Sequence, residues 1–305
     1  SDDIVEAVVA APDGSRVVVG GRFQQLNGSP IVGIGAVDGA SGGLLPWTSR
    51  PIPTRQDTNR SGVTELSLVG GVVYASADGE GGHWFDGRFA ADFATGDLLW
   101  LNNCYGATYG VSVMDQVMYS VGHAQDCTSV GTFADHDPQI WKRATADTTF
   151  ATGTDQGAPG SNMNYAYQPV PTQLPWYPEV NAGSYTGMYQ GGWALANNGT
   201  YLVMGGEFTR VNGQNQQGLA TFAKRSVAPN KVGPAYSPMK PSVLSLNSGT
   251  TRVAWTGTSD IDDGTLTYEV LRDNGTVPVF SIDAKSPWWA LPQLGFTDTG
   301  LVPGS

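Results

Sequence analysis

The sequence predicts an all-β protein built from repeated units, and three observations carry this prediction. The 305-residue chain holds 41 glycines and 12 tyrosines, and together with its many Val, Thr and Trp residues this composition favours strands joined by tight turns. It shows no long helical periodicity. A nine-residue motif, GGRFQQLNG at 20–28, returns as GGEFTRVNG at 205–213, and a β-rich segment with a tight turn precedes each copy. Repetition on this scale indicates an array of one supersecondary unit.

Two further matches divide the array into four units. DGASGGLL at 38–45 matches DFATGDLL at 92–99, and LVGGVVY at 68–74 matches VMDQVMY at 113–119. Units then begin near residues 4, 63, 108 and 190, a period of about 45–60 residues. Short strands and hairpins at this spacing predict the four-stranded blades of a β-propeller over residues 1–225. Since propellers close with about four to eight blades, either this propeller is small or its other blades precede residue 1.

The composition changes after residue 225. Residues 226–240 form a Pro-rich linker. In the last part, 241–305, the segments TRVAWT at 251–256 and LTYEVLR at 266–272 alternate in the manner of sandwich strands. Together with GLVPGS at 300–305 they resemble a fibronectin type III domain, where that last motif introduces the penultimate strand. The resemblance implies an incomplete, truncated sandwich with an exposed apolar face and sheet edge, and hence a piece of a longer polypeptide.

The glycine motif resembles the delta-60-type propeller repeats of secreted, multi-domain bacterial surface proteins. The other segments that carry this resemblance are 92–99, 104–127 and QLPWYP at 173–178. Such proteins commonly place a fibronectin type III or related domain after the propeller. The resemblance therefore implies a secreted or cell-surface location and an architecture, and it indicates no reaction.

Charge and cysteine content bound the function. A net charge of −11 without a basic patch excludes a nucleic-acid role, and without a run of 18 apolar residues we expect no membrane span. The chain begins directly in a strand-like stretch, so we expect a trimmed start. Cys104 and Cys127 form an even pair in an acidic, Lys-poor chain, which favours a disulfide and an extracytoplasmic location. The alternative is two buried free thiols.

Two polar groups are candidate metal sites. His123, Asp126 and His136 carry ligand types that suit zinc or another transition metal, which could activate water, although their spacing matches no known metal motif. The alternative is a set of hydrogen bonds that fix a loop. A second group offers the oxygen ligands that calcium favours without the spacing of an EF-hand; its alternative is a solvated turn between strands. Its members are Asp260, Asp262 and Asp263.

Aromatic residues are the strongest binding feature of the sequence. The candidate binding residues are Trp84, Trp176, Tyr177, Tyr185 and Tyr189. Exposed rings beside amides suit carbohydrate, because a sugar ring has an apolar face and a hydroxylated rim. The alternative is that these rings pack between blades.

The sequence thus predicts a secreted or cell-surface interaction protein that binds extracellular glycan or protein through propeller loops, without catalysis. A first alternative is a propeller-based hydrolase or lyase acting on extracellular polysaccharide, with carboxylates at the mouth of the central channel. A second is a structural subunit of an extracellular assembly, in which blade edges or the incomplete sandwich pair with a neighbouring chain. No nucleophile elbow, phosphate loop, dinucleotide fingerprint or HExxH motif occurs.

Overall fold

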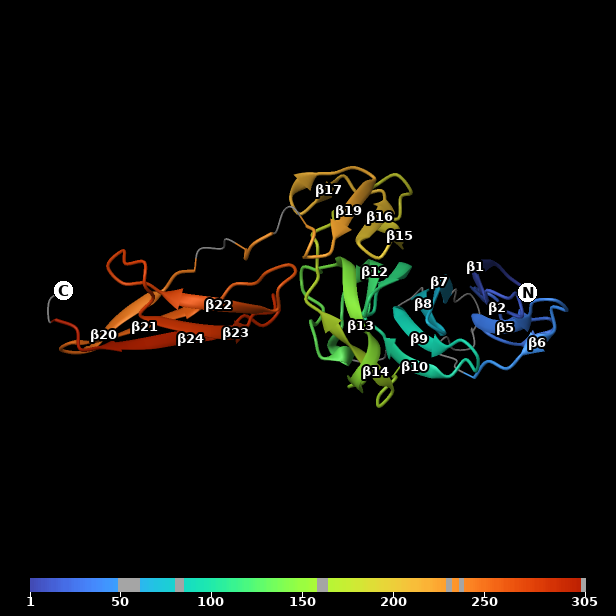
Figure 1. Ribbon diagram of the computed structural model, residues 1–305, viewed down its shortest axis with the longest axis horizontal. Coiled ribbons are helices and arrows are strands. Elements are labelled where there is room, and N and C mark those ends of the chain that lie inside the picture. The colour runs from blue at the N-terminus through green and yellow to red at the C-terminus, as the bar shows by residue number, and fades with distance from the viewer. Residues whose placement is uncertain (49–60, 80–84, 158–163, 229–231, 236–238, 303–305) are drawn as a thin grey trace. The chain divides into compact units, whose positions relative to one another are not determined.

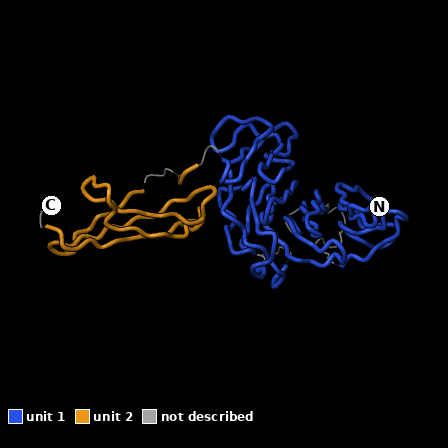
Figure 2. The backbone as a smooth tube through the Cα atoms, viewed as in Figure 1, with its two compact units in different colours: residues 1–229 blue, residues 230–305 orange. Residues whose placement is uncertain are grey.

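The computed structural model describes residues 1–48, 61–79, 85–157, 164–228, 232–235 and 239–302. Within these ranges every regular element is a β-strand except one 3-10 turn, Thr128–Val130 (Figure 1), so the all-β prediction is confirmed. The chain divides into two compact units, Ser1–Pro229 and Asn230–Ser305 (Figure 2), whose boundary lies inside the predicted linker. In the described ranges no helix is long and apolar enough to cross a membrane.

The first unit contains four antiparallel sheets, and each is made of strands that follow one another in the chain. Sheet I comprises β1 (Val5–Ala10), β2 (Arg16–Gly21), β5 (Ile34–Asp38) and β6 (Leu44–Leu45). Sheet II comprises β7 (Gly62–Val69), β8 (Val72–Asp78), β9 (Arg88–Asp92) and β10 (Leu98–Asn102). Sheet III comprises β11 (Thr108–Met114), β12 (Val117–Ala124), β13 (Lys142–Thr154) and β14 (Pro169–Leu174). Sheet IV comprises β15 (Gly192–Asn197), β16 (Tyr201–Gly206) and β19 (Leu219–Ala223).

Small hairpins follow the second strand of sheets I and IV. They are β3 (Gln25–Leu26) with β4 (Ser29–Pro30), and β17 (Arg210–Val211) with β18 (Gln214–Asn215). Both hairpins fall in or directly after the two copies of the glycine motif. The predicted unit starts likewise fall at or beside the first residues of β1, β7, β11 and β15.

A β-bulge interrupts the first strand of every one of these sheets, near the start of the strand. The residues that the bulges leave without a partner on the neighbouring strand are Glu6, Thr64, Tyr109 and Trp193. A bulge twists the strand and re-aims the side chain. Beside it the backbones approach closely: a Cβ on Gly21 would lie 2.2 Å from the carbonyl oxygen of Ile4, and one on Gly206 would lie 2.0 Å from that of Gly191. The second glycine of the repeated motif is therefore required in both copies.

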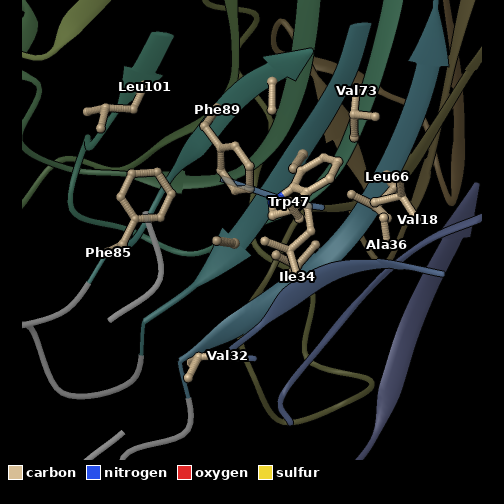
Figure 3. Packing of buried hydrophobic residues seen from close by; sticks show 14 residues of the cluster. Val18, Val32, Ile34, Ala36, Trp47, Leu66, Val73, Phe85, Phe89 and Leu101 are labelled. Atoms are coloured by element: carbon tan, nitrogen blue, oxygen red, sulfur yellow. The ribbon is translucent and has the colours of Figure 1, made fainter. Parts of the chain in front are cut away.

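The sheets pack on one another in chain order: β1 and β2 contact β7, β7 and β8 contact β11, and β11 and β12 contact β15. A buried apolar cluster joins sheets I and II and includes Val18, Ile34, Val73 and Phe89 (Figure 3). A second cluster joins sheets III and IV around Met204. Sheets I and IV thus lie at the two ends of the row (Figure 1).

Two strong links reinforce the middle of the row. Cys104, before β11, forms a disulfide with Cys127, after β12. The disulfide prediction is confirmed, and the alternative of two free thiols is wrong. Arg88 of β9 forms an ion pair with Asp147 of β13, and both side chains are almost completely buried. This pair connects sheet II to sheet III.

The second unit consists of a three-stranded and a two-stranded antiparallel sheet. The first comprises β20 (Ser242–Asn247), β21 (Thr250–Thr256) and β24 (Gln293–Thr299), and the second β22 (Thr265–Val270) and β23 (Phe280–Lys285). Trp255 of β21 and Tyr268 of β22 belong to one buried cluster, with ring centroids 6.5 Å apart. The Tyr268 hydroxyl is hydrogen-bonded to the carbonyl oxygen of Thr258 at 3.0 Å.

Candidate aromatic binding site

Aromatic rings gather where sheets III and IV meet. The bulges of β11 and β15 bring the rings of Tyr109 and Trp193 to a centroid distance of 4.6 Å. The ring of His123, from β12, lies 6.3 Å from Tyr109 and 6.3 Å from Trp141. We call Tyr109, His123, Trp141 and Trp193 the aromatic cluster. Trp141 directly precedes β13 and is 45% exposed, so part of the aromatic cluster is accessible to solvent.

Glu207 fastens the loop 184–190 to this cluster. Its carboxylate accepts hydrogen bonds from the backbone N–H of Thr186 at 2.9 Å, the Thr186 hydroxyl at 2.8 Å and the indole Nε1 of Trp193 at 3.2 Å. The backbone N–H of Gln190 adds a fourth at 3.3 Å. These hydrogen bonds, first of all that from the Thr186 backbone, lower the pKa of Glu207. The loop is therefore held by an ionised carboxylate at neutral pH.

The same loop presents two tyrosines to solvent. Tyr185 is 94% exposed and Tyr189 is 64% exposed. Arg143 donates a hydrogen bond from Nη1 to the carbonyl oxygen of Tyr189 at 2.9 Å, and its guanidinium carbon lies 5.3 Å from the centre of the Trp141 ring. A largely buried cation thus joins the loop to the exposed indole, combining a charge-assisted hydrogen bond with a cation–π contact.

His123 uses both ring nitrogens inside the protein. Nε2 accepts a hydrogen bond from the backbone N–H of Ala107 at 3.3 Å, so Nδ1 carries the hydrogen and donates to the side-chain oxygen of Gln190 at 3.1 Å. Burial lowers the pKa of His123, which keeps the imidazole neutral. Neither nitrogen points a lone pair at an open site, so this histidine is a packing and positioning residue.

The predicted transition-metal site is not formed. Asp126 accepts hydrogen bonds from the backbone N–H and hydroxyl of Thr128 at 3.0 and 2.6 Å, while His136 lies in an exposed loop where its backbone N–H donates to Asp135. In the described part of the chain, His123, Asp126 and His136 do not form a group of ligand atoms within 4.8 Å. The prediction of a metal site at these residues is corrected, because the fold does not bring His123, Asp126 and His136 together.

The acidic turn between β21 and β22 does bring its carboxylates together. Ligand atoms of Asp260, Asp262 and Asp263 all lie within 4.8 Å of one another. The Asp260 side chain also accepts the backbone N–H of Asp262 at 3.1 Å, a bond that fixes such a turn by itself.

Two of the predicted binding residues pack inside the first unit, as the alternative expected: Tyr177 is buried and Trp176 is partly buried against the core. Trp176 packs between Tyr119 and Phe222, with ring centroids 4.9 and 5.2 Å away. Tyr177 is only 3% exposed and contacts Phe133. Burial leaves the Tyr177 ring without access to a ligand, whereas the Trp176 ring is partly buried and takes part in packing contacts. The predicted residue Trp84 lies outside the described residues.

Three residues of the site, Tyr109, Trp141 and Arg143, were missed in the sequence. Tyr109 occupies the same repeat position as Trp193, so alignment of the units would have shown this signal. Trp141 and Arg143 follow an irregular loop of the third unit and have no counterpart in the other repeats. No sequence signal marks them.

Comparison of the chain with family models finds no match, and comparison with curated proteins finds none either. Inference of function therefore rests on the geometry of the site.

Proposed function

We propose that the chain is an extracytoplasmic, non-enzymatic binding protein that recognises glycan through the aromatic cluster and the loop 184–190. The observation that carries this proposal is the set of exposed rings, Trp141, Tyr185 and Tyr189, on a framework of hydrogen bonds. Flat rings stack on the apolar face of a sugar, and neighbouring polar groups bind its hydroxyl rim.

The repeated architecture supports a propeller-type assignment for the first unit. Its sheets follow the chain strand by strand and share one bulge position, as expected for copies of one blade. The buried Trp255–Tyr268 contact between two sheets supports a fibronectin type III-like assignment for the second unit. The disulfide and the acidic composition support an extracytoplasmic location.

Binding is favoured over hydrolysis by the state of the carboxylate at the site. Hydrolysis of a glycosidic bond needs two opposed carboxyl groups about 5–10 Å apart. Glu207 accepts four hydrogen bonds from the protein itself, so it acts as a structural acceptor.

The polysaccharide hydrolase is retained as a second candidate because of one pair of carboxyl groups. Burial, aided by the charge of Asp78, raises the pKa of Asp86 well above its ordinary value, whereas Asp78 is ion-paired with Arg22 at 2.8 Å. A carboxyl group with a raised pKa close to an ion-paired carboxylate resembles the acid and base pair of a glycosidase. Both residues are 8% exposed, which ranks the pair below the open aromatic site. The test is an assay for reducing ends released from polysaccharide. If the unchanged chain releases them and Asp86→Asn does not, hydrolysis becomes the first candidate function and binding the second.

The test is a glycan screen followed by affinity measurement with variants. Trp141→Ala and Tyr189→Ala should each weaken the best glycan at least tenfold, about 1.4 kcal/mol, with unchanged circular dichroism. Tyr167→Ala is the matched control, since Tyr167 is 87% exposed and lies in a different loop. Absence of any glycan ligand, or equal affinity of all three variants, would refute the proposal.

A further inference from the structure

Among the described residues, one face of the last sheet of the row is exposed or half-exposed along its whole length. Residues paired directly across antiparallel strands share a face, which assigns the outer face of sheet IV from its register. Its members are Ala194, Ala196, Tyr201, Val203, Gly205, Leu219, Thr221 and Ala223. This face carries no charged residue, and Leu219 and Tyr201 are 57% and 43% exposed. A contiguous, uncharged face with exposed Leu and Tyr side chains is a candidate interaction surface.

The corresponding face of sheet I is covered by sheet II. Gly20 pairs with Ile34 in sheet I as Gly205 pairs with Leu219 in sheet IV, yet Ile34 is 0% exposed. A Cβ on Gly20 would lie 2.5 Å from Cγ1 of Val63 in β7, whereas a Cβ on Gly205 would meet nothing within 4 Å. The outer face of sheet IV therefore has the form of a face that receives another sheet.

The complementary face is partly open at the other end of the row. By register, the outer face of sheet I comprises Val8, Ala10, Val17, Val19, Gly35, Val37 and Leu44. Val19, Val37 and Leu44 pack against the buried cluster of Phe23, Leu26 and Ile31, so the exposed part of this face lies on β1. Val8 of β1 and Leu195 of β15 occupy equivalent positions, each the second residue after the bulge of its strand. Leu195 is covered by sheet III and is 8% exposed, whereas Val8 is 57% exposed. Val5 of β1 and Val63 of β7 are also equivalent, since each directly precedes the bulge residue of its strand. Val5 is 39% exposed.

We propose that these two faces bind each other between two copies of the chain, the outer face of sheet IV of one copy packing on the outer face of sheet I of the other. The contact would repeat the packing that already joins sheets I and II within one molecule, with Gly205 meeting Val5 as Gly20 meets Val63. A second copy is the partner because the chain itself carries both complementary faces, apolar and without charge. Such a contact is heterologous, so it closes a ring or extends a filament.

Sedimentation velocity of the full chain tests the proposal, with association expected at or below a concentration on the order of 100 µM. Leu219→Asp and Val8→Asp should each give monomers, because either change buries a charge in every contact. An equimolar mixture of the two variants should form one-to-one heterodimers, since the intact face of each variant meets the intact face of the other. Gln214→Asp, on the exposed hairpin β17–β18, adds the same charge away from both faces and should associate like the unchanged chain.

Gly205→Ala separates association from folding. Because its Cβ meets nothing within 4 Å in the single molecule, its melting temperature should stay unchanged while association weakens at least tenfold. A monomer at all concentrations would overturn the proposal. Loss of association in Leu219→Asp but not in Val8→Asp would also overturn it, because that result indicates a contact between two sheets IV.

Discussion

Trp193 donates its indole hydrogen to Glu207 at 3.2 Å, so the bulge residue of sheet IV is bonded to the third residue of the glycine motif. Sheet I has the same relationship with different chemistry: Arg22, the third residue of the first copy, bonds to the bulge residue Glu6 at 2.7 Å. The repeat therefore conserves a position and a contact while the side chains change.

Glu207→Gln should detach the loop 184–190. A carboxylate has two oxygen acceptors but an amide has only one, so the Thr186 N–H loses its acceptor in this variant. A hydrogen bond to a charged group contributes about 1.5–3 kcal/mol. We expect faster hydrogen exchange in residues 184–190, with weaker glycan binding. Glu179→Gln is the control, because Glu179 is exposed and follows a different strand. Unchanged exchange in Glu207→Gln would show that the loop is held by other contacts.

The same carboxylate predicts a pH dependence. Because the pKa of Glu207 is lowered from 4.5, its contribution to loop order is complete above pH 4.5 and is lost as the pH falls through the lowered value. Exchange in the loop, corrected for intrinsic rates, should therefore rise under acid conditions in the unchanged chain. In Glu207→Gln the exchange should be high at every pH.

Glu65 predicts a pH effect of opposite sign. Burial raises its pKa from 4.5 to about 7, although its side chain accepts the Val111 N–H at 2.9 Å. The folded state then binds the proton more tightly than the unfolded state, so stability is complete below pH 4.5 and falls as the pH rises to about 7. Glu65→Gln should raise the melting temperature at pH 8 and leave it unchanged at pH 4. An equal gain at both values would exclude titration of Glu65 as the cause.

Removal of the disulfide should destabilise the first unit without changing its fold. Cys104 and Cys127 are separated by 23 positions, and a loop of this size contributes about 3 kcal/mol in the chain-entropy description. The double variant Cys104→Ser with Cys127→Ser should show this loss in urea unfolding, and reduction of the unchanged chain should reproduce it. A loss confined to one of the two experiments would point to the serine side chains or to the reductant.

The buried pair Arg88–Asp147 should respond unequally to single and double replacement. Asp147→Asn leaves the Arg88 cation, 1% exposed, without its counter-charge, which costs about 3–5 kcal/mol. Arg88→Met combined with Asp147→Leu removes both charges and should cost less than the single change. Urea unfolding of the three chains measures the difference. If the double variant is the least stable, apolar packing cannot replace the pair at this junction.

The sequence predicted the features that repeat and missed those that occur once. Glycine at positions 21 and 206 marked the first and last units because the backbone there leaves no space for a Cβ, and alternating apolar residues marked the strands. For Trp176 and Tyr177 the sequence left binding and packing both open, because an aromatic residue among Pro and Gly has the same local pattern whether it is exposed or buried. Only the tertiary neighbours Tyr119 and Phe133 decide this.

The metal prediction failed for a related reason. Ligand types can be counted in a sequence, but His123 is occupied by Ala107 and Gln190, which lie far apart in the chain. Trp141 became important only because the fold places it beside His123 and Arg143. Contacts between different repeats are not encoded in the pattern of any one repeat.

Each of the four sheets has a bulge residue in its first strand. The side chain of this residue does not follow the alternation between the two faces of the sheet that the other residues of the strand follow. Glu6, Thr64, Tyr109 and Trp193 present an acid, a hydroxyl, a phenol and an indole at that position. Substitution there can therefore alter the chemistry of a sheet while leaving its strand register intact.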